Sequence, residues 1–383
     1  MFLALRDLRF ATGRFALMGS VVALISLLLV MLSGLTAGLG GQNTAAIDRL
    51  GEQGVQRLVF GGAAGQEPTA SFTQSEFTVA QRDAWAATDG VASVEPLGVS
   101  QGRAIGLEHP VDTDPQGRAD VSGEPTTGVA TTAFIGLTPG GSDAPAGVEL
   151  GQIVLSQDVA DSLHAQAGDA VAVSGFVYTV ADVVPTEYYS HSPVTWLALE
   201  DWNAISHTAD DAVLGTAGLV RFDAGADVDA VADAGDDAAG TVAETVKGSY
   251  DALPSYRSEN GSLMTMQGFL YGISALVVIA FLSIWTVQRT RDIAVLKALG
   301  GSNGWVLKDS LAQAAFVLVG GVAVGTGLAA VIGAFAGRAV PFELSWATTA
   351  VPAAGVLVLG MLAAVVAVYR VTRIDPLVAL GGN

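Results

Sequence analysis

A polar stretch over residues 256–266 carries the side chains of this chain that are best suited to binding a ligand. It combines the phenol of Tyr256, the guanidinium of Arg257, the carboxylate of Glu259 and the thioethers of Met264 and Met266. A flat amphiphile would meet apolar walls and polar ends there, and haem is one such molecule. Tyr and Met are known axial ligand types for haem iron. Glu259 or Met266 could therefore bind the iron, and Arg257 could pair with a propionate.

A second interpretation of the same residues is structural. Methionine is a common apolar filler of irregular gaps, and Tyr and Arg commonly anchor a helix at the membrane interface. Met31, near the outer end of the first apolar run, would contribute to a ligand site under the first interpretation only. The stretch predicts either a cargo site or an interfacial anchor.

Four long apolar runs surround these residues, and each is long enough to cross the hydrocarbon core, which takes about 20 residues. The first run is longer than the roughly 7–15 apolar residues of a signal peptide, so we expect it to stay as a membrane span. We expect the spans over 15–39, 263–287, 313–337 and 350–369. The outer segments would be a domain over 40–262 and a short loop over 338–349. The cytoplasmic segments would be an amphipathic helix over 1–14, a coupling loop over 288–312 and a tail over 370–383.

Charge is distributed very unevenly along the 383 residues. Residues 42–262 hold 32 acidic and 8 basic side chains, a net charge of −24, whereas the whole chain has −19. Nine of the ten basic residues outside that segment fall at the N-terminus, between the second and third runs, or at the C-terminus. The positive-inside rule places these three segments in the cytoplasm. The sequence predicts a multi-pass membrane protein with its large acidic domain outside.

The outer domain shows an alternation of short strand and helix patterns. Leu58–Gly61, Val91–Val99 and Gly128–Gly136 have the composition of strands. Within Gly151–Val184 the sequence suggests a strand at Ile153–Leu155, a short helix, a Gly-Asp turn, and then strands at Ala170–Ser174, Phe176–Thr179 and Ala181–Val184. Residues 227–243 are acidic and rich in alanine, which fits either a surface helix or a loop. The fold class expected is a four-span α-helical membrane protein with an inserted α+β outer domain.

The segment between the second and third runs contains a short amphipathic helix pattern. Ile293, Leu296 and Leu299 recur at helical spacing beside Asp292 and Lys297, and Gly300 is a typical helix stop. A helix clamped between two spans can bind a partner on the membrane surface and move both spans. The alternative is an ordinary basic juxtamembrane loop.

Residues 292–300, Asp-Ile-Ala-Val-Leu-Lys-Ala-Leu-Gly, resemble the signature that follows the second span of FtsX/MacB-type ABC permeases, with Asp292 in place of the usual Glu. The ending Arg373–Leu380, with its Pro and Ala-Leu, is also similar to that family, as is the order of one span, a large outer domain and three spans.

The resemblance implies a non-catalytic permease homodimer in membrane lipid, with an ABC ATPase dimer bound on the cytoplasmic side at Asp292, Ile293, Leu296, Lys297, Leu299 and Gly300. ATP and Mg would belong to that partner. Haem-efflux permeases with four spans are members of the family, so haem is the first cargo to consider. Other members transmit force to a cell-wall hydrolase without moving cargo, and this is the alternative function.

Three Gly-x-x-x-Gly pairs lie in the first three apolar runs, at Gly34/Gly38, Gly268/Gly272 and Gly321/Gly325. Small residues four apart let helix backbones approach closely in lipid. The resemblance places the first two spans at the dimer interface, so Gly268 and Gly272 are expected there. The alternative is packing within one subunit, and such spacing also arises by chance among 47 glycines.

Several other activities have no support in the sequence. The chain has no cysteine, which excludes thiol and disulfide chemistry. The glycine-rich residues 300–304 lack the Gly-Lys-Ser/Thr that holds phosphates, and the acidic balance disfavours nucleic acid. The four histidines show no tight metal-ligand spacing. Tyr188–His191 could form an exposed binding loop, or these residues could have structural or surface roles. No intrinsic cofactor is expected.

Overall fold

The computed structural model of the chain describes residues 12–63, 66–206, 212–288 and 303–372. The chain forms two compact units. The helical unit comprises residues 1–39 and 260–383, and the outer unit comprises residues 40–259. Each unit is described by itself below.

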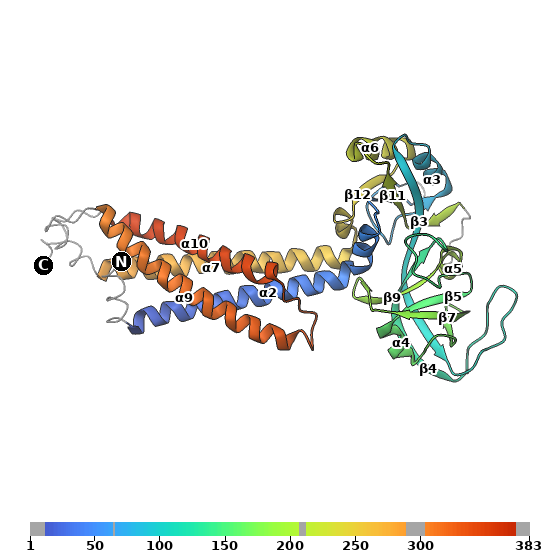
Figure 1. The fold of residues 1–383 in the computed structure, drawn as a ribbon, viewed down its shortest axis with the longest axis horizontal. Coiled ribbons are helices and arrows are strands. Elements are labelled where there is room, and N and C mark those ends of the chain that lie inside the picture. Colours follow the sequence, from blue (N-terminus) through green and yellow to red (C-terminus); the bar gives the residue numbers. More distant parts are fainter. Residues whose placement is uncertain (1–11, 64–65, 207–211, 289–302, 373–383) are drawn as a thin grey trace, which may run out of the picture. The chain divides into compact units, whose positions relative to one another are not determined.

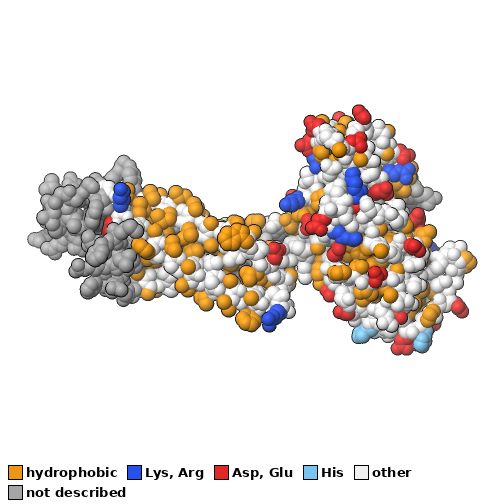
Figure 2. Space-filling model, viewed as in Figure 1, with side chains coloured by type: hydrophobic (Ala, Val, Ile, Leu, Met, Phe, Trp, Pro, Cys, Tyr) orange, Lys and Arg blue, Asp and Glu red, His pale blue; other side chains and the backbone are white. Residues whose placement is uncertain are grey.

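Four long helices cross the helical unit, namely α2 (Thr12–Glu52), α7 (Pro254–Gln288), α9 (Asn303–Ala336) and α10 (Trp346–Thr372) (Figure 1). Each contains a stretch long and apolar enough to cross a membrane. Hydrophobic side chains cover the visible face of these helices, whereas acidic side chains are scattered over the outer unit (Figure 2). The predicted four-span architecture is confirmed.

The core of the helical unit takes side chains from all four helices. One cluster of almost completely buried side chains contains Val22 and Leu29 of α2, Val278 of α7, Leu318 of α9 and Val356 of α10. Lipid tails are as apolar as these side chains, so close packing rather than hydrophobic transfer must hold such a cluster together.

Two helices continue past the ends of the spans that the sequence predicts. α2 runs beyond Leu39 to Glu52, because Ala46, Ile47 and Leu50 are buried in the outer core and keep the chain helical. α7 begins at Pro254. Proline suits the first turn of a helix, where its missing N–H would have no helical partner.

Six strands of the outer unit form a small closed barrel. The ring order is β3 (Val91–Leu107), β4 (Thr126–Leu137), β9 (Ser192–Ala198), β5 (Gln152–Ser156), β7 (Phe176–Val184) and β6 (Ala170–Val173), and β6 pairs back onto β3. The pairs β4–β9 and β5–β7 are parallel. β8 (Tyr188–Tyr189) forms a short hairpin with β9.

The long strand β3 also belongs to a second sheet. Its first half pairs with β11 (Ala217–Phe222), which is followed in the sheet by β1 (Arg57–Phe60) and β12 (Val242–Thr245). Helices α3 (Val79–Ala86) and α6 (Val228–Ala239) contribute Trp85 and Ala232 to the core of this lobe. The remaining elements are β2 (Phe77–Thr78), β10 (Val213–Gly215) and the 3-10 turn η1 (Gly248–Ala252).

Helices α4 (Gln157–Leu163) and α5 (Leu199–Ile205) pack on the barrel at glycine positions. A Cβ at Gly98 or Gly136 would lie 2.2 Å or 2.4 Å from Trp202 of α5, so only glycine admits the indole ring. Trp202 Nε1 then donates to Ser100 Oγ at 3.0 Å.

The structure decides the extent of one strand and the secondary structure of one acidic segment. Phe176–Val184 is one continuous strand rather than two short ones, since it pairs with β6 along one part and with β5 along another. Most of residues 227–243 form α6, which Asp227 caps by accepting a hydrogen bond from Ala230 N–H, and β12 follows.

Candidate cargo-binding and coupling sites

The residues predicted to bind cargo are divided between the two units. Tyr256, Arg257 and Glu259 belong to the outer unit, and Met31, Met264 and Met266 to the helical unit. All except Met31 lie on α7, on its first four turns. The two groups are therefore treated in turn.

Glu259 is held by two polar side chains of the outer unit. His191 Nε2 lies 2.9 Å from both carboxylate oxygens, and Asn43 Nδ2 donates to Oε2 at 3.2 Å. Asn43 is 1% exposed, whereas the Glu259 side chain is 39% exposed. The carboxylate is thus open to water on one side and bonded on the other. The Arg257 side chain is exposed.

Tyr256 packs on the core of the outer unit. Its ring lies 5.4 Å from that of Tyr250 at 67°, an edge-on arrangement. The Tyr250 hydroxyl donates to Asp48 of α2. Burial raises the pKa of the Tyr250 phenol, and the hydrogen bond to Asp48 raises it further. Tyr256 therefore has a packing role, whatever else it contacts.

Met31 and Met266, 235 positions apart in the sequence, line one apolar pocket of the helical unit. The pocket has a volume of about 590 Å³, within the roughly 300–1,000 Å³ typical of small-molecule sites. Its wall consists of apolar side chains, namely Leu28, Met31, Leu32, Leu35, Met266, Phe269, Leu270, Ala336, Val340 and Phe342. Met264 is absent from this lining and is 54% exposed. We call this cavity the Met31–Met266 pocket.

The loop between α9 and α10 closes one side of the Met31–Met266 pocket. A Cβ at Gly34 of α2 would lie 2.3 Å from the Phe342 ring, and one at Gly38 would lie 2.2 Å from the Pro341 carbonyl oxygen. Glu343 N–H donates to the Gly34 carbonyl at 3.0 Å. The Gly34/Gly38 pair thus serves as a socket for this loop.

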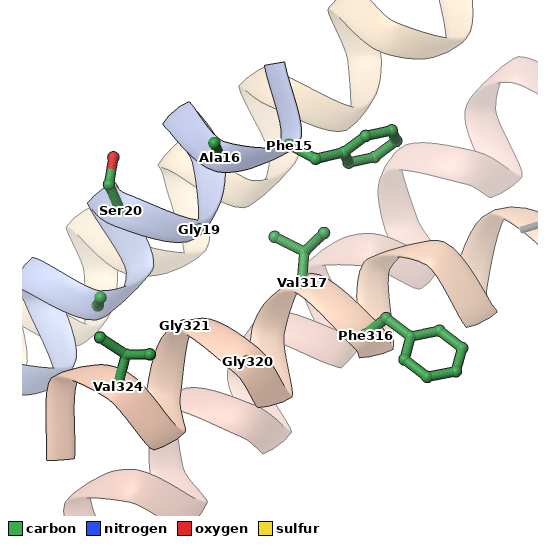
Figure 3. Close-up of a pocket in the computed structure, with 10 residues that line it drawn as sticks. Phe15, Ala16, Gly19, Ser20, Phe316, Val317, Gly320, Gly321 and Val324 are labelled. Atoms are coloured by element: carbon green, nitrogen blue, oxygen red, sulfur yellow. The ribbon is translucent and has the colours of Figure 1, made fainter. Parts of the chain in front are cut away.

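A second apolar groove lies between α2 and α9 (Figure 3). It has a volume of about 420 Å³, and its lining includes Phe15 and Gly19 of α2 and Val317 and Gly320 of α9. In Figure 3, Val317 points from α9 toward α2. A Cβ at Gly321 would lie 2.9 Å from the Gly19 carbonyl oxygen, so the two backbones come close at one end of the groove.

The three Gly-x-x-x-Gly pairs differ in what they contact. Gly34/Gly38 and Gly321/Gly325 pack within this subunit, against the α9–α10 loop and α2 respectively. Within the described residues, a Cβ at Gly268 or Gly272 would meet nothing within 4 Å. The α7 pair therefore presents an open glycine face.

The residues predicted to couple the chain to an ATPase, which are Asp292, Ile293, Leu296, Lys297, Leu299 and Gly300, lie outside the described residues. Three residues with defined roles were missed at the sequence level: His191, Asn43 and Phe342. His191 lies between β8 and β9, in a segment for which the sequence allowed either a structural role or an exposed loop. Nothing in the sequence indicates which residue it contacts. Phe342 is a single aromatic residue in a short loop.

Comparison with known proteins finds a family model that matches the C-terminal part of the chain. Residues 264–376 match the FtsX-like permease C-terminal domain. A relative from Staphylococcus haemolyticus, named as a hemin transport system permease protein HrtB, is 30% identical over 132 residues, which span 34% of this chain and only 38% of that relative. A protein of the same name from Staphylococcus epidermidis is 22% identical over the full length of both chains.

The extracellular domain of the ABC-type transporter YknZ is similar at 14% identity and a TM-score of 0.31, covering 49% of this chain and 95% of that domain. At this TM-score, the likeness supports no argument about the outer unit. The order of spans, the matched domain and the full-length relative agree with one another. The chain is therefore a multi-pass plasma-membrane protein whose residues 264–376 match the C-terminal domain of FtsX-like permeases.

Proposed function

We propose that the chain is the permease subunit of an ABC efflux complex that expels a membrane-embedded amphiphile, with haem as the leading cargo. The Met31–Met266 pocket is the observation that carries this proposal. Its apolar wall would receive the face of a porphyrin, and methionine adapts well to varied apolar ligands. The names of the two staphylococcal relatives support haem among the amphiphiles that would fit.

Polar groups on α7 are further candidates for contact with the cargo. The Glu259 carboxylate, or the Met266 thioether, would bind ferric iron. Arg257 is exposed and would pair with a propionate, since guanidinium forms strong charge-assisted bonds with carboxylates. Tyr256 and Met264 remain candidates for further contact.

Movement of the spans would come from a separate ABC ATPase dimer, which binds ATP and Mg and presses on residues 292–300. The permease itself would catalyse no reaction. A second copy of the chain would dock on the open face at Gly268 and Gly272, since small residues allow close helix contact in lipid. The resulting homodimer would present each proposed cargo group twice.

A haemin absorbance titration of the purified permease tests the cargo. We expect a saturable Soret shift in the wild type, and about tenfold weaker binding in Met266→Ala, because the pocket loses an apolar side chain from its lining. Glu259→Ala is expected to weaken binding and to change the Soret position if its carboxylate binds the iron. Met264→Ala is the comparison on the same helix, and equal losses at both methionines would place haemin outside the pocket.

The coupling role is tested with the triple change Asp292→Arg/Leu296→Glu/Leu299→Glu. We expect the permease to lose its stimulation of the partner's ATPase, because the change places charges on the apolar face of the predicted helix. The control is Glu108→Arg/Asp112→Arg, two exposed positions in the outer unit. Normal complex formation together with normal stimulation in the triple variant would refute the coupling role.

An alternative function is transmission of force to an outer partner, such as a cell-wall hydrolase, without cargo. A cleft of about 760 Å³ in the outer unit favours it, because its lining mixes apolar Phe72 and Trp202 with polar Glu76 and Ser100. Stimulation of ATPase activity by haemin would support transport. A stable outer protein partner, with no response to haemin, would support force transmission.

A further inference from the structure

The turn between β8 and β9 has an unusual backbone. Tyr189 pairs with Ser192, so Ser190 and His191 are the two central residues of the hairpin. Their φ angles are 48° and 64°. Two positive φ angles in a two-residue hairpin turn normally call for Gly, Asn or Asp. In this turn the two positions are Ser190 and His191 instead, and the side chains of both form contacts.

The turn is bound to the parts of α2 and α7 that belong to the outer unit. Ser190 N–H donates to the Asn43 carbonyl at 3.1 Å, and His191 N–H donates to the Gln42 carbonyl at 2.9 Å. The Ser190 hydroxyl lies 2.8 Å from that of Ser255, which donates to Asn43 Oδ1 at 2.7 Å. The turn is therefore docked through both its backbone and its side chains.

The imidazole of His191 faces oxygen acceptors at both ring nitrogens. Nε2 lies 2.9 Å from the Glu259 oxygens, and Nδ1 lies 3.4 Å from Gln42 Oε1. A ring that accepted from Asn43 Nδ2, 3.0 Å from Nε2, would turn its lone pair toward the Glu259 carboxylate. Nε2 therefore carries a proton and donates to that carboxylate.

Glu259 supplies the charge that faces this ring. Among the contacts of the described residues, α2 presents the neutral amides of Gln42 and Asn43 to the turn, and Gln101 of β3 donates to the Ser190 carbonyl and to Ser192 Oγ. The Glu259 carboxylate on α7 is the one titratable group among them. The docked turn is thus sensitive to whatever else binds Glu259.

We propose that the β8–β9 turn and the cargo compete for the Glu259 carboxylate. His191 holds Glu259 while the site is empty, and a ferric porphyrin that takes a Glu259 oxygen as its axial ligand releases the turn. The iron would exchange a water ligand for the carboxylate oxygen, which would give up its hydrogen bond to His191 Nε2. This inference rests on the proposed function, in which Glu259 binds haem iron. Because binding linkage is reciprocal, a docked turn must weaken haem binding as much as haem weakens docking.

The test compares two histidines of the outer unit that both have positive φ angles, His191 at 64° and His164 at 52°. His164 caps the C-terminus of α4. Changing either to Gly removes a side chain and suits the backbone. In the full-length permease titrated with haemin, we expect His191→Gly to bind on the order of tenfold more tightly than the wild type, and His164→Gly to match the wild type.

Hydrogen–deuterium exchange provides the second measurement. Haemin at saturation is expected to speed exchange of the Ser190 and His191 amides in the wild type, since these N–H groups bond to α2 only in the docked turn. Equal haemin affinity in the wild type and His191→Gly, with no change in exchange, would overturn the competition and leave the haem site standing. Weaker binding in His191→Gly would also overturn it. A wild type without saturable haemin binding would overturn the haem proposal itself, and the competition with it.

Discussion

Gly325→Leu is expected to destabilise the helical unit severely, whereas Gly327→Leu, two positions along the same helix, is not. A Cβ at Gly325 would lie 2.1 Å from the Ala23 carbonyl oxygen and 2.9 Å from Ser26 Cβ. The carbonyl belongs to the α2 backbone, so it cannot move aside without moving the helix. At Gly327, a Cβ would meet nothing within 4 Å among the described residues.

The size of the effect follows from the kind of contact. Overpacking a core typically costs about 1–3 kcal/mol, and more when backbone must shift. Small residues at helix contacts are also what allows association in lipid. We expect Gly325→Leu to lower by many degrees the temperature at which purified permease loses its monodisperse peak in size-exclusion chromatography. Equal behaviour of the two leucine variants would show that α2 and α9 do not meet at Gly325.

Arg221→Met is expected to destabilise the outer unit by about 3–5 kcal/mol, because it leaves a buried charge without its partner. Arg221 Nη2 donates to Asp143 Oδ1 and, at 3.3 Å, to the Gln53 carbonyl. Asp143 is 4% exposed. Without the guanidinium, the carboxylate must stay ionised away from water or take up a proton, and either is unfavourable at neutral pH.

Arg57→Met is the matched control for this prediction. Arg57 also donates to an aspartate, but the side chain of that partner, Asp229, is 88% exposed. Exposed ion pairs contribute about 0–1 kcal/mol, since water solvates the remaining charge. Native-state hydrogen exchange of the β11 amides in the full chain would measure both costs. A loss below about 1 kcal/mol in Arg221→Met would mean that Asp143 finds water or another donor. The double change Asp143→Leu/Arg221→Met should recover part of the loss, because no buried charge remains.

The four spans and the charge partition could be predicted because each depends on local composition. An apolar run of sufficient length crosses a bilayer wherever the rest of the chain lies, and basic flanks orient it. Several strands of the outer unit were predicted for the same reason, since Leu58–Gly61, Gly128–Gly136 and Ile153–Leu155 overlap β1, β4 and β5. The pairing of β6 with β3, which closes the barrel, was not predicted, because the sequence of a strand does not show which strand it pairs with.

For the candidate site too, the sequence indicated the type of side chain, and the structure decided which residues come together. The sequence selected Met31, Met266 and Glu259 by their side-chain chemistry, and the structure brings Met31 and Met266 into one pocket. The role of Gly34 and Gly38 as a socket for the α9–α10 loop depends on a contact about 300 residues away in the chain, and small residues show only that something can come close.

The sequence by itself determined that this protein has four membrane spans and an acidic outer domain, because hydrophobicity and charge are properties of single stretches. Only the tertiary structure decided that Glu259 is bonded to His191, 68 positions earlier, and that the glycines of α7 face no other part of the described subunit. The physical reason is that side-chain type limits which bonds a residue can form, whereas folding decides which partner comes within reach.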